Sequence, residues 1–108
     1  MSGAKDIIFN TCTFDDGSTY AISVQGCSFF KFLSCNFLGS SAAGISTATS
    51  ACNNYTIMSC TFRDNVVGVE CHASDDWIKI ILNDFIGDTL DDHYTSKGLV
   101  EKNIGDDI

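Results

Sequence analysis

The side chains best suited to acid–base chemistry gather in the second half of the sequence. A glutamate and a histidine alternate along one short segment, and three further groups follow later: Glu70 and His72, then Asp91, Asp92 and His93. Two carboxyl groups about 5 Å apart have the separation that retaining glycosidases use, and such a pair places an acid beside a base. We therefore take Glu70, Asp91 and Asp92 as candidate catalytic residues and the two histidines as candidate substrate-binding residues. The alternative is a row of solvent-facing side chains.

These side chains meet only if two strands carry them side by side. If Val69 points inward, alternation along a strand turns Glu70 outward. Placing Leu90 over Val69 in the neighbouring strand then puts Asp91 over Glu70, about 4.8 Å away, and stacks the two histidines. A shorter loop in that part of the chain leaves this register open by a couple of residues.

A second candidate group, Asp75, Asp76 and Trp77, follows in an expected turn. An exposed tryptophan beside carboxylates is a platform on which sugars stack, so these three join the candidate substrate-binding residues. The alternative is a tryptophan that opens a strand and covers the core. Calcium needs six to eight converging oxygen ligands, whereas most other aspartates lie at corners beside Gly or Asn, where they form turns. We expect no metal and no cofactor.

Composition limits the classes of protein that the chain can be. It has 108 residues, of which 44% are hydrophobic and 19% charged, and this predicts one folded domain. The net charge is −8 with only six basic residues, so binding to a nucleic-acid backbone is not expected. No apolar stretch approaches the roughly 20 residues of a membrane span, and the N-terminal residues lack the apolar run of a signal peptide.

An internal repeat predicts the elements that position these residues. Five segments, residues 7–14, 29–37, 55–62, 77–85 and 98–104, end in a large apolar residue at separations of 23, 25, 23 and 19. The end residues are Phe14, Phe37, Phe62, Phe85 and Ile104, and five residues before them lie Phe9, Phe32, Ile57, Ile80 and Leu99. Short alternating segments around Ile22, Ile45 and Val69 follow after turn residues. Units this small bury an apolar face only by stacking on copies of themselves.

The repeat predicts an all-β solenoid in which each coil adds one strand to each parallel sheet. Proline is absent, as expected where every backbone N–H pairs with the next coil. Equivalent positions hold Cys12, Cys35 and Cys60, and a second pair recurs at Cys27 and Cys52. We therefore expect stacked free thiols in the core rather than disulfides or a zinc site.

The strings FLSCNFLGSSAAGIS and YTIMSCTFRDNVVGVE carry a resemblance to a known fold. In each, an apolar–x–apolar strand runs into a polar corner, an aromatic residue, a turn and a second strand that contains glycine. The chain thereby resembles the right-handed parallel β-helix (pectate-lyase-like) superfamily. The resemblance implies four to five coils of 19 to 25 residues each. The coils are expected over residues 7–108, after a leader of residues 1–6. The Cys-x-Phe triplets are also similar to the pentapeptide-repeat family, whose square coils have a constant length.

The resemblance is specific for fold and leaves several functions open. The superfamily includes polysaccharide lyases, glycoside hydrolases, adhesins and bacteriophage tailspikes. We expect a module of a bacteriophage tailspike or similar appendage that contacts host polysaccharide, as a virion component or a cytoplasmic protein. The alternatives are a polysaccharide-degrading enzyme and an acidic mimic of DNA that binds a nucleic-acid enzyme. Open coil ends imply a partner, either a homo-oligomer such as a trimer or the rest of a longer chain.

Overall fold

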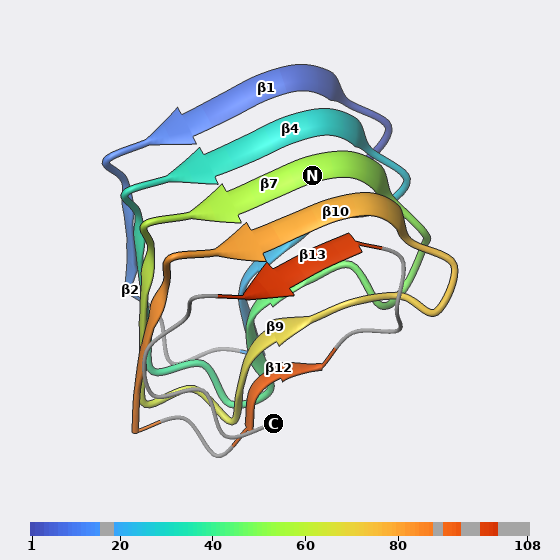
Figure 1. The fold of residues 1–108 in the computed structure, drawn as a ribbon. Helices are drawn as coiled ribbons and strands as arrows, with labels where there is room; N and C mark the ends of the chain where they lie inside the picture. The colour runs from blue at the N-terminus through green and yellow to red at the C-terminus, as the bar shows by residue number, and fades with distance from the viewer. Residues whose placement is uncertain (16–18, 88–89, 94–97, 102–108) are drawn as a thin grey trace.

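Three parallel sheets wind around one core in the computed structural model, which describes residues 1–15, 19–87, 90–93 and 98–101 (Figure 1). The first sheet contains β1 (Lys5–Asn10), β4 (Ser28–Leu33), β7 (Asn53–Met58), β10 (Asp76–Ile81) and β13 (Gly98–Glu101). The second contains β2 (Thr13–Asp15), β5 (Asn36–Leu38), β8 (Thr61–Arg63) and β11 (Asp84–Ile86). The third contains β3 (Tyr20–Ser23), β6 (Ala43–Ser46), β9 (Val67–Glu70) and β12 (Leu90–His93). The described ranges contain no helix long and apolar enough to cross a membrane.

In-register pairing of successive coils confirms the predicted apolar columns. The column in the second sheet consists of Phe14, Phe37, Phe62 and Phe85. The first sheet stacks Phe9, Phe32, Ile57 and Ile80, and the third stacks Ile22, Ile45 and Val69. Neighbouring rings in the phenylalanine column lie 4.9 Å apart between centroids, which is about one strand spacing. The same side chains that mark the repeat therefore form the core.

The strand β12 takes a register that differs from the expected one by two residues. Leu90 pairs with Val67, and Asp92 pairs with Val69. β9 begins at Val67, five residues after Phe62, and β12 begins at Leu90, five residues after Phe85. Because the two turns are equally long, the first residues of the two strands pair with each other. Matching Leu90 to Val69 as two apolar residues was wrong because turn length sets the register here.

The strand β13 also differs from the expected register, by one residue. Ile80 pairs with Val100, and Leu99 pairs with Lys79. Counting back from Ile104 as the equivalent of the column phenylalanines was therefore wrong by one position. Ile104 itself lies outside the described residues. A shift of one residue exchanges the two faces of a strand, so Val100 takes the place predicted for Leu99.

Residues 1–6, expected as a leader, belong to the first coil. β1 begins at Lys5, and the residues before it pair with the following coil. The N-terminal amino group of Met1 donates to the Ser23 carbonyl at 2.7 Å. The Gly3 N–H donates to the Gln25 carbonyl at 2.9 Å, and the Gln25 N–H donates back to Met1 O at 2.7 Å. The parallel ladder thus extends to the first residue of the sequence.

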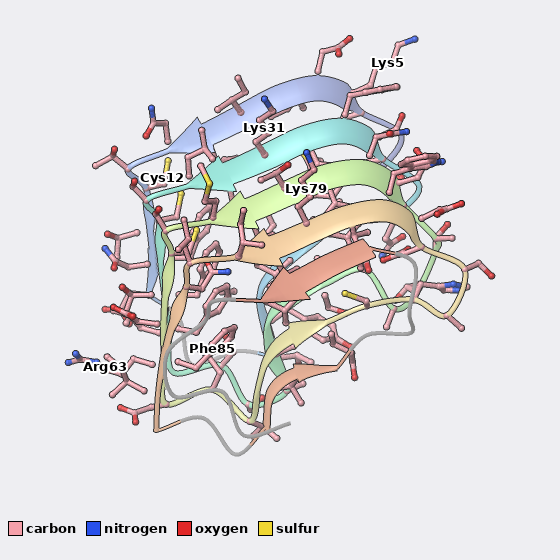
Figure 2. All side chains as sticks on the ribbon, viewed as in Figure 1. Lys5, Cys12, Lys31, Arg63, Lys79 and Phe85 are labelled. Atoms are coloured by element: carbon pink, nitrogen blue, oxygen red, sulfur yellow. The ribbon has the colours of Figure 1, made fainter. Side chains whose placement is uncertain are left out.

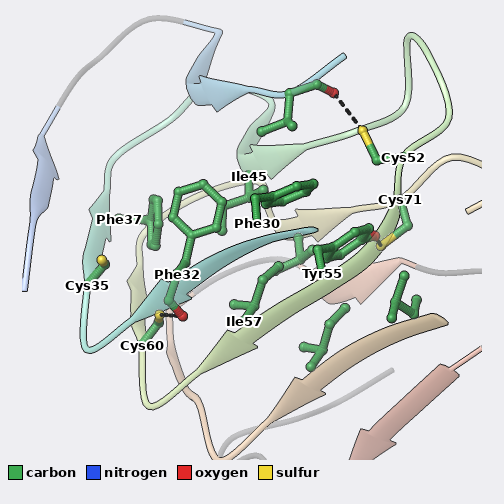
Figure 3. Close-up of a cluster of buried hydrophobic side chains, with 14 of the residues drawn as sticks. Phe30, Phe32, Cys35, Phe37, Ile45, Cys52, Tyr55, Ile57, Cys60 and Cys71 are labelled. Atoms are coloured by element: carbon green, nitrogen blue, oxygen red, sulfur yellow. Dashed lines mark hydrogen bonds between the residues drawn. The ribbon is translucent and has the colours of Figure 1, made fainter. Parts of the chain in front are cut away.

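At the corner between the first and second sheets, side-chain hydrogen bonds are added to the backbone ladder. One column of residues there has φ between 56° and 58°: Thr11, Ser34, Ser59 and Leu82. The next residues are three cysteines and then Asn83. The Cys60 thiol donates to the Phe32 carbonyl at 3.4 Å (Figure 3), and the Asn83 side-chain amide donates to Ile57 O at 3.1 Å. All six cysteines are free, as predicted, and every one except Cys12 is buried.

Candidate functional site

The outward side of the first sheet carries two columns of exposed or half-exposed side chains. One column consists of Asp6, Phe29, Asn54 and Trp77, and the other consists of Ile8, Lys31, Thr56 and Lys79. The residues next to the aromatic pair, Phe30 and Ile78, are buried in the core. Strand alternation therefore places aromatic, cationic and amide groups together on one face.

The column that contains Phe29 and Trp77 has an unusual backbone. All four of its members have φ between 55° and 60°, so each strand has a left-handed residue at this point, while the pairing stays one for one on both sides of it. Asp6 and Asn54 are of types that tolerate a left-handed backbone, whereas large aromatic residues are unfavourable there. Trp77 is 72% exposed and Phe29 is 56% exposed, so burial compensates little of this strain. Such outliers occur most often at functional sites.

A shallow groove of about 350 Å³ runs over β1, β4 and β7 on this face. Asp6, Ile8, Phe29, Lys31 and Asn54 line it. Phe29, Lys31 and Asn54 were not predicted as site residues. The signal that could have found them is the Phe29–Phe30 pair, because alternation must turn one of two adjacent strand residues outward.

Positive charge also gathers on this face. Lys5, Lys31 and Lys79 lie along the first sheet (Figure 2). Lys31 and Lys79 are both register partners of Thr56, so two strand spacings, about 9.6 Å, separate their backbones. Three of the six basic residues of the chain therefore lie on the first sheet, together with the carboxylates of Asp6 and Asp76.

The predicted catalytic residues lie instead at the third sheet. Glu70 is half-buried, and its Oε1 accepts a hydrogen bond from Ser46 Oγ at 3.2 Å. Its register partner is His93 rather than Asp91, so the expected stacking of two carboxylates is wrong in register. The side chains of Asp91, Asp92 and His93 lie outside the described residues, and their roles stay predictions.

His72 and Asp76 flank the turn before β10 and remain at least partly exposed. The Ser74 N–H donates to His72 Nδ1 at 3.0 Å, which leaves the proton of a neutral imidazole on Nε2. The Trp77 N–H donates to Asp76 Oδ1 at 2.9 Å. The Asp76 carboxylate thus binds the backbone N–H of Trp77, the residue with the left-handed backbone.

Asp75 differs most from expectation, because it is buried with 2% exposure. Its Oδ1 accepts from the Cys52 N–H at 2.7 Å. Its Oδ2 accepts from the hydroxyls of Thr47 and Tyr55, the latter at 2.7 Å, and from the His72 N–H at 3.3 Å. Both oxygens are engaged by the protein itself. Asp75 therefore holds the corner together and does not face a ligand.

The place of Asp75 follows from the repeat. Cys27, Cys52 and Asp75 follow one another at the same intervals as Phe37, Phe62 and Phe85 in the phenylalanine column. The Cys27 N–H donates to Cys52 Sγ at 3.4 Å, just as the Cys52 N–H donates to Asp75. A carboxylate thus occupies the fourth-coil position of a thiol column.

The family model described as the right-handed β-helix region matches residues 1–85. The chain belongs to this family. No match was found among curated proteins or among solved structures. The coils of this β-helix cross three sheets and are unequal in length, because Phe37 lies closer in sequence to its partner Phe14 than to its partner Phe62. They therefore differ from the constant square coils that the alternative of a pentapeptide repeat requires.

Burial keeps the Tyr55 hydroxyl and several buried thiols protonated. It raises the pKa of Tyr55 far above the usual value, with a further contribution from Cys71, whose sulfur lies 3.2 Å from the phenol oxygen. Burial likewise raises the pKa of Cys60 to about 12, and it raises the pKa of Cys35 and Cys52. In the protein alone these thiols are therefore held in the protonated form, which is a poor nucleophile. Across the described residues, no group of three or more His, Cys, Asp and Glu side chains is arranged to hold a metal ion.

Proposed function

We propose that this β-helix is a structural module of a virion appendage or similar surface protein, and that the outward side of its first sheet contacts a host polysaccharide. The observation that supports this most is the pair Phe29 and Trp77. Both are large, exposed and set on an unfavourable left-handed backbone. A protein that keeps aromatic side chains under these conditions gains something other than stability from them.

The chemistry of the face suits an extended chain of sugars. Aromatic rings stack on the apolar faces of sugar rings. Lys31, Asn54 and Asp6 line the same groove, and they supply donors and acceptors for hydroxyl groups. Because equivalent side chains recur at about 4.8 Å from coil to coil, a linear polymer lying across the strands meets several of them at once.

Affinity electrophoresis through gels that contain bacterial surface polysaccharides tests this proposal. We expect one or more of them to retard the wild-type protein. Trp77→Ala and Phe29→Ala should each weaken the binding about tenfold, equivalent to about 1.4 kcal/mol.

Leu82→Ala is the matched control, since Leu82 is also exposed and has a left-handed backbone but lies at the corner beyond β10. It should retain wild-type binding. The proposal fails if no polysaccharide retards the protein, or if Leu82→Ala loses as much affinity as Trp77→Ala.

A further inference from the structure

The corner between the first and second sheets holds three thiols in a column, and the outermost one is accessible. Cys12 is half-exposed, whereas Cys35 and Cys60 are each 1% exposed. Figure 2 shows Cys12 at this corner. Cys12 is therefore the most accessible thiol of this column.

Cys12 and Cys35 are held one strand spacing apart by pairing on both sides. Before them, Asn10 is the register partner of Leu33, and after them Thr13 is the register partner of Asn36. The Asn36 N–H also donates to the Cys12 carbonyl at 2.9 Å. Burial raises the pKa of Cys35, with a smaller contribution from the neighbouring Cys12 thiol.

This separation suits a bridging ion better than a disulfide. A disulfide needs its Cβ atoms about 3.5–4.5 Å apart, whereas paired parallel strands are about 4.8 Å apart. With the roughly 2.3 Å of a zinc–thiolate bond as a guide to metal–thiolate distances, two sulfurs on opposite sides of one ion lie about 4.6 Å apart. Linear coordination by two thiolates is typical of soft monovalent ions, and thiolate ligands select Cu(I).

The other pairs of stacked cysteines are less suitable. Cys27 and Cys52 are both 2% exposed, so an ion has no path to them. The Cys52 sulfur also accepts a hydrogen bond from the Cys27 N–H at 3.4 Å. Cys60 lies one coil deeper than Cys35, and its thiol is strongly held in the protonated form, with its pKa raised by burial to about 12.

We propose that Cys12 and Cys35 form a two-coordinate site for one soft monovalent cation, of the class of Cu(I) and Ag(I). Binding breaks two S–H bonds, forms two S–metal bonds and releases two protons. No electrons are transferred. Zn(II) should not bind tightly here, since it takes four ligands in a tetrahedral arrangement and the corner supplies two.

The test is a titration of the reduced, oxygen-free protein with Cu(I) in competition with a chromogenic Cu(I) chelator. We expect one Cu(I) per chain, confirmed by native mass spectrometry, and no comparable uptake of Zn(II). Loss of an outer-shell partner of a metal ligand lowers metal affinity about 10- to 100-fold. Cys12→Ser and Cys35→Ser each remove a ligand itself, so each should lower the Cu(I) affinity by more than this. The matched controls Cys27→Ser and Cys52→Ser should retain the site.

Thermal unfolding of each variant shows whether it folds. If Cys35→Ser fails to fold, Cys12→Ser carries the test, because its side chain is half-exposed. Cu(I) binding that survives Cys12→Ser, or that is lost equally in Cys27→Ser, would overturn the proposal. Failure to bind one equivalent of Cu(I) in the wild-type protein would overturn it too.

Discussion

At the scale of single residues, Asp75 shows how this fold accommodates a buried carboxylate. Four donors surround its two oxygens: the hydroxyls of Thr47 and Tyr55 and the backbone N–H groups of Cys52 and His72. Buried charge is tolerated only when its hydrogen-bonding capacity is satisfied. The raised pKa of Tyr55, caused mainly by burial, keeps the phenol proton available for donation to this carboxylate.

Replacing Asp75 by Asn should destabilise the protein by about 2 kcal/mol, because an amide nitrogen would face groups that are themselves donors. Chemical denaturation with urea measures this difference. Asp76→Asn is the matched control: its neighbouring carboxylate is only half-buried, and its replacement should change stability by less than about 0.5 kcal/mol. Equal effects of the two substitutions would show that the hydrogen bonds of Asp75 are not what stabilises this corner.

At the scale of elements, the repeat was sufficient to predict a parallel β-solenoid and most positions of its apolar columns. Alternation and the spacing of phenylalanines recur from coil to coil, so the columns of the first coils rest on several consistent copies of the pattern. The spacing of the phenylalanine column also links Cys27, Cys52 and Asp75. The prediction of Asp75 as a substrate-binding residue in a turn misses this column, because aspartate is common in turns and differs in type from the two cysteines that precede it in the column.

Two features of the elements were harder to predict. The register of β12 depends on the length of a turn, and apolar side chains in both strands offered a plausible but wrong match between Leu90 and Val69. The outward face of the first sheet depends on a left-handed residue that recurs in four of its strands. Asp6 and Asn54 belong to residue types that are common in a left-handed backbone. Phe29 and Trp77 do not, so their residue types give no sign of the positive φ that the structure shows.

The left-handed backbone of Trp77 leads to a prediction about stability and polysaccharide binding. Trp77→Asn should stabilise the protein by about 0.5–1 kcal/mol, because asparagine adopts the left-handed backbone at lower cost and Trp77 buries little surface. The same variant should lose polysaccharide binding, as expected when a strained residue serves function. Urea denaturation and affinity electrophoresis measure the two effects. Trp77→Phe, which keeps an aromatic ring on the same backbone, should leave stability unchanged; a gain as large as that of Trp77→Asn would argue against strain.

At the scale of the whole molecule, each coil is stabilised mainly by the coils next to it. Phe37 stacks between Phe14 and Phe62, with ring centroids 4.9 Å away on both sides. Among the described residues, Phe14 of the first coil stacks in its column on Phe37 alone and is half-buried. Stability in such a solenoid is approximately a sum over coils and the interfaces between them. The same substitution should therefore cost less in the first coil than in the second.

Phe37→Ala should destabilise the protein by about 3–5 kcal/mol, the usual cost of removing a fully buried phenylalanine, and Phe14→Ala should cost about half as much. Urea denaturation at low protein concentration compares them, with wild-type protein as the reference. Equal costs would contradict the open first coil and would mean that another surface covers Phe14 in solution. Repeating the comparison over a range of protein concentrations separates the two cases, because a cover supplied by a second copy of the chain makes the cost of Phe14→Ala rise with concentration.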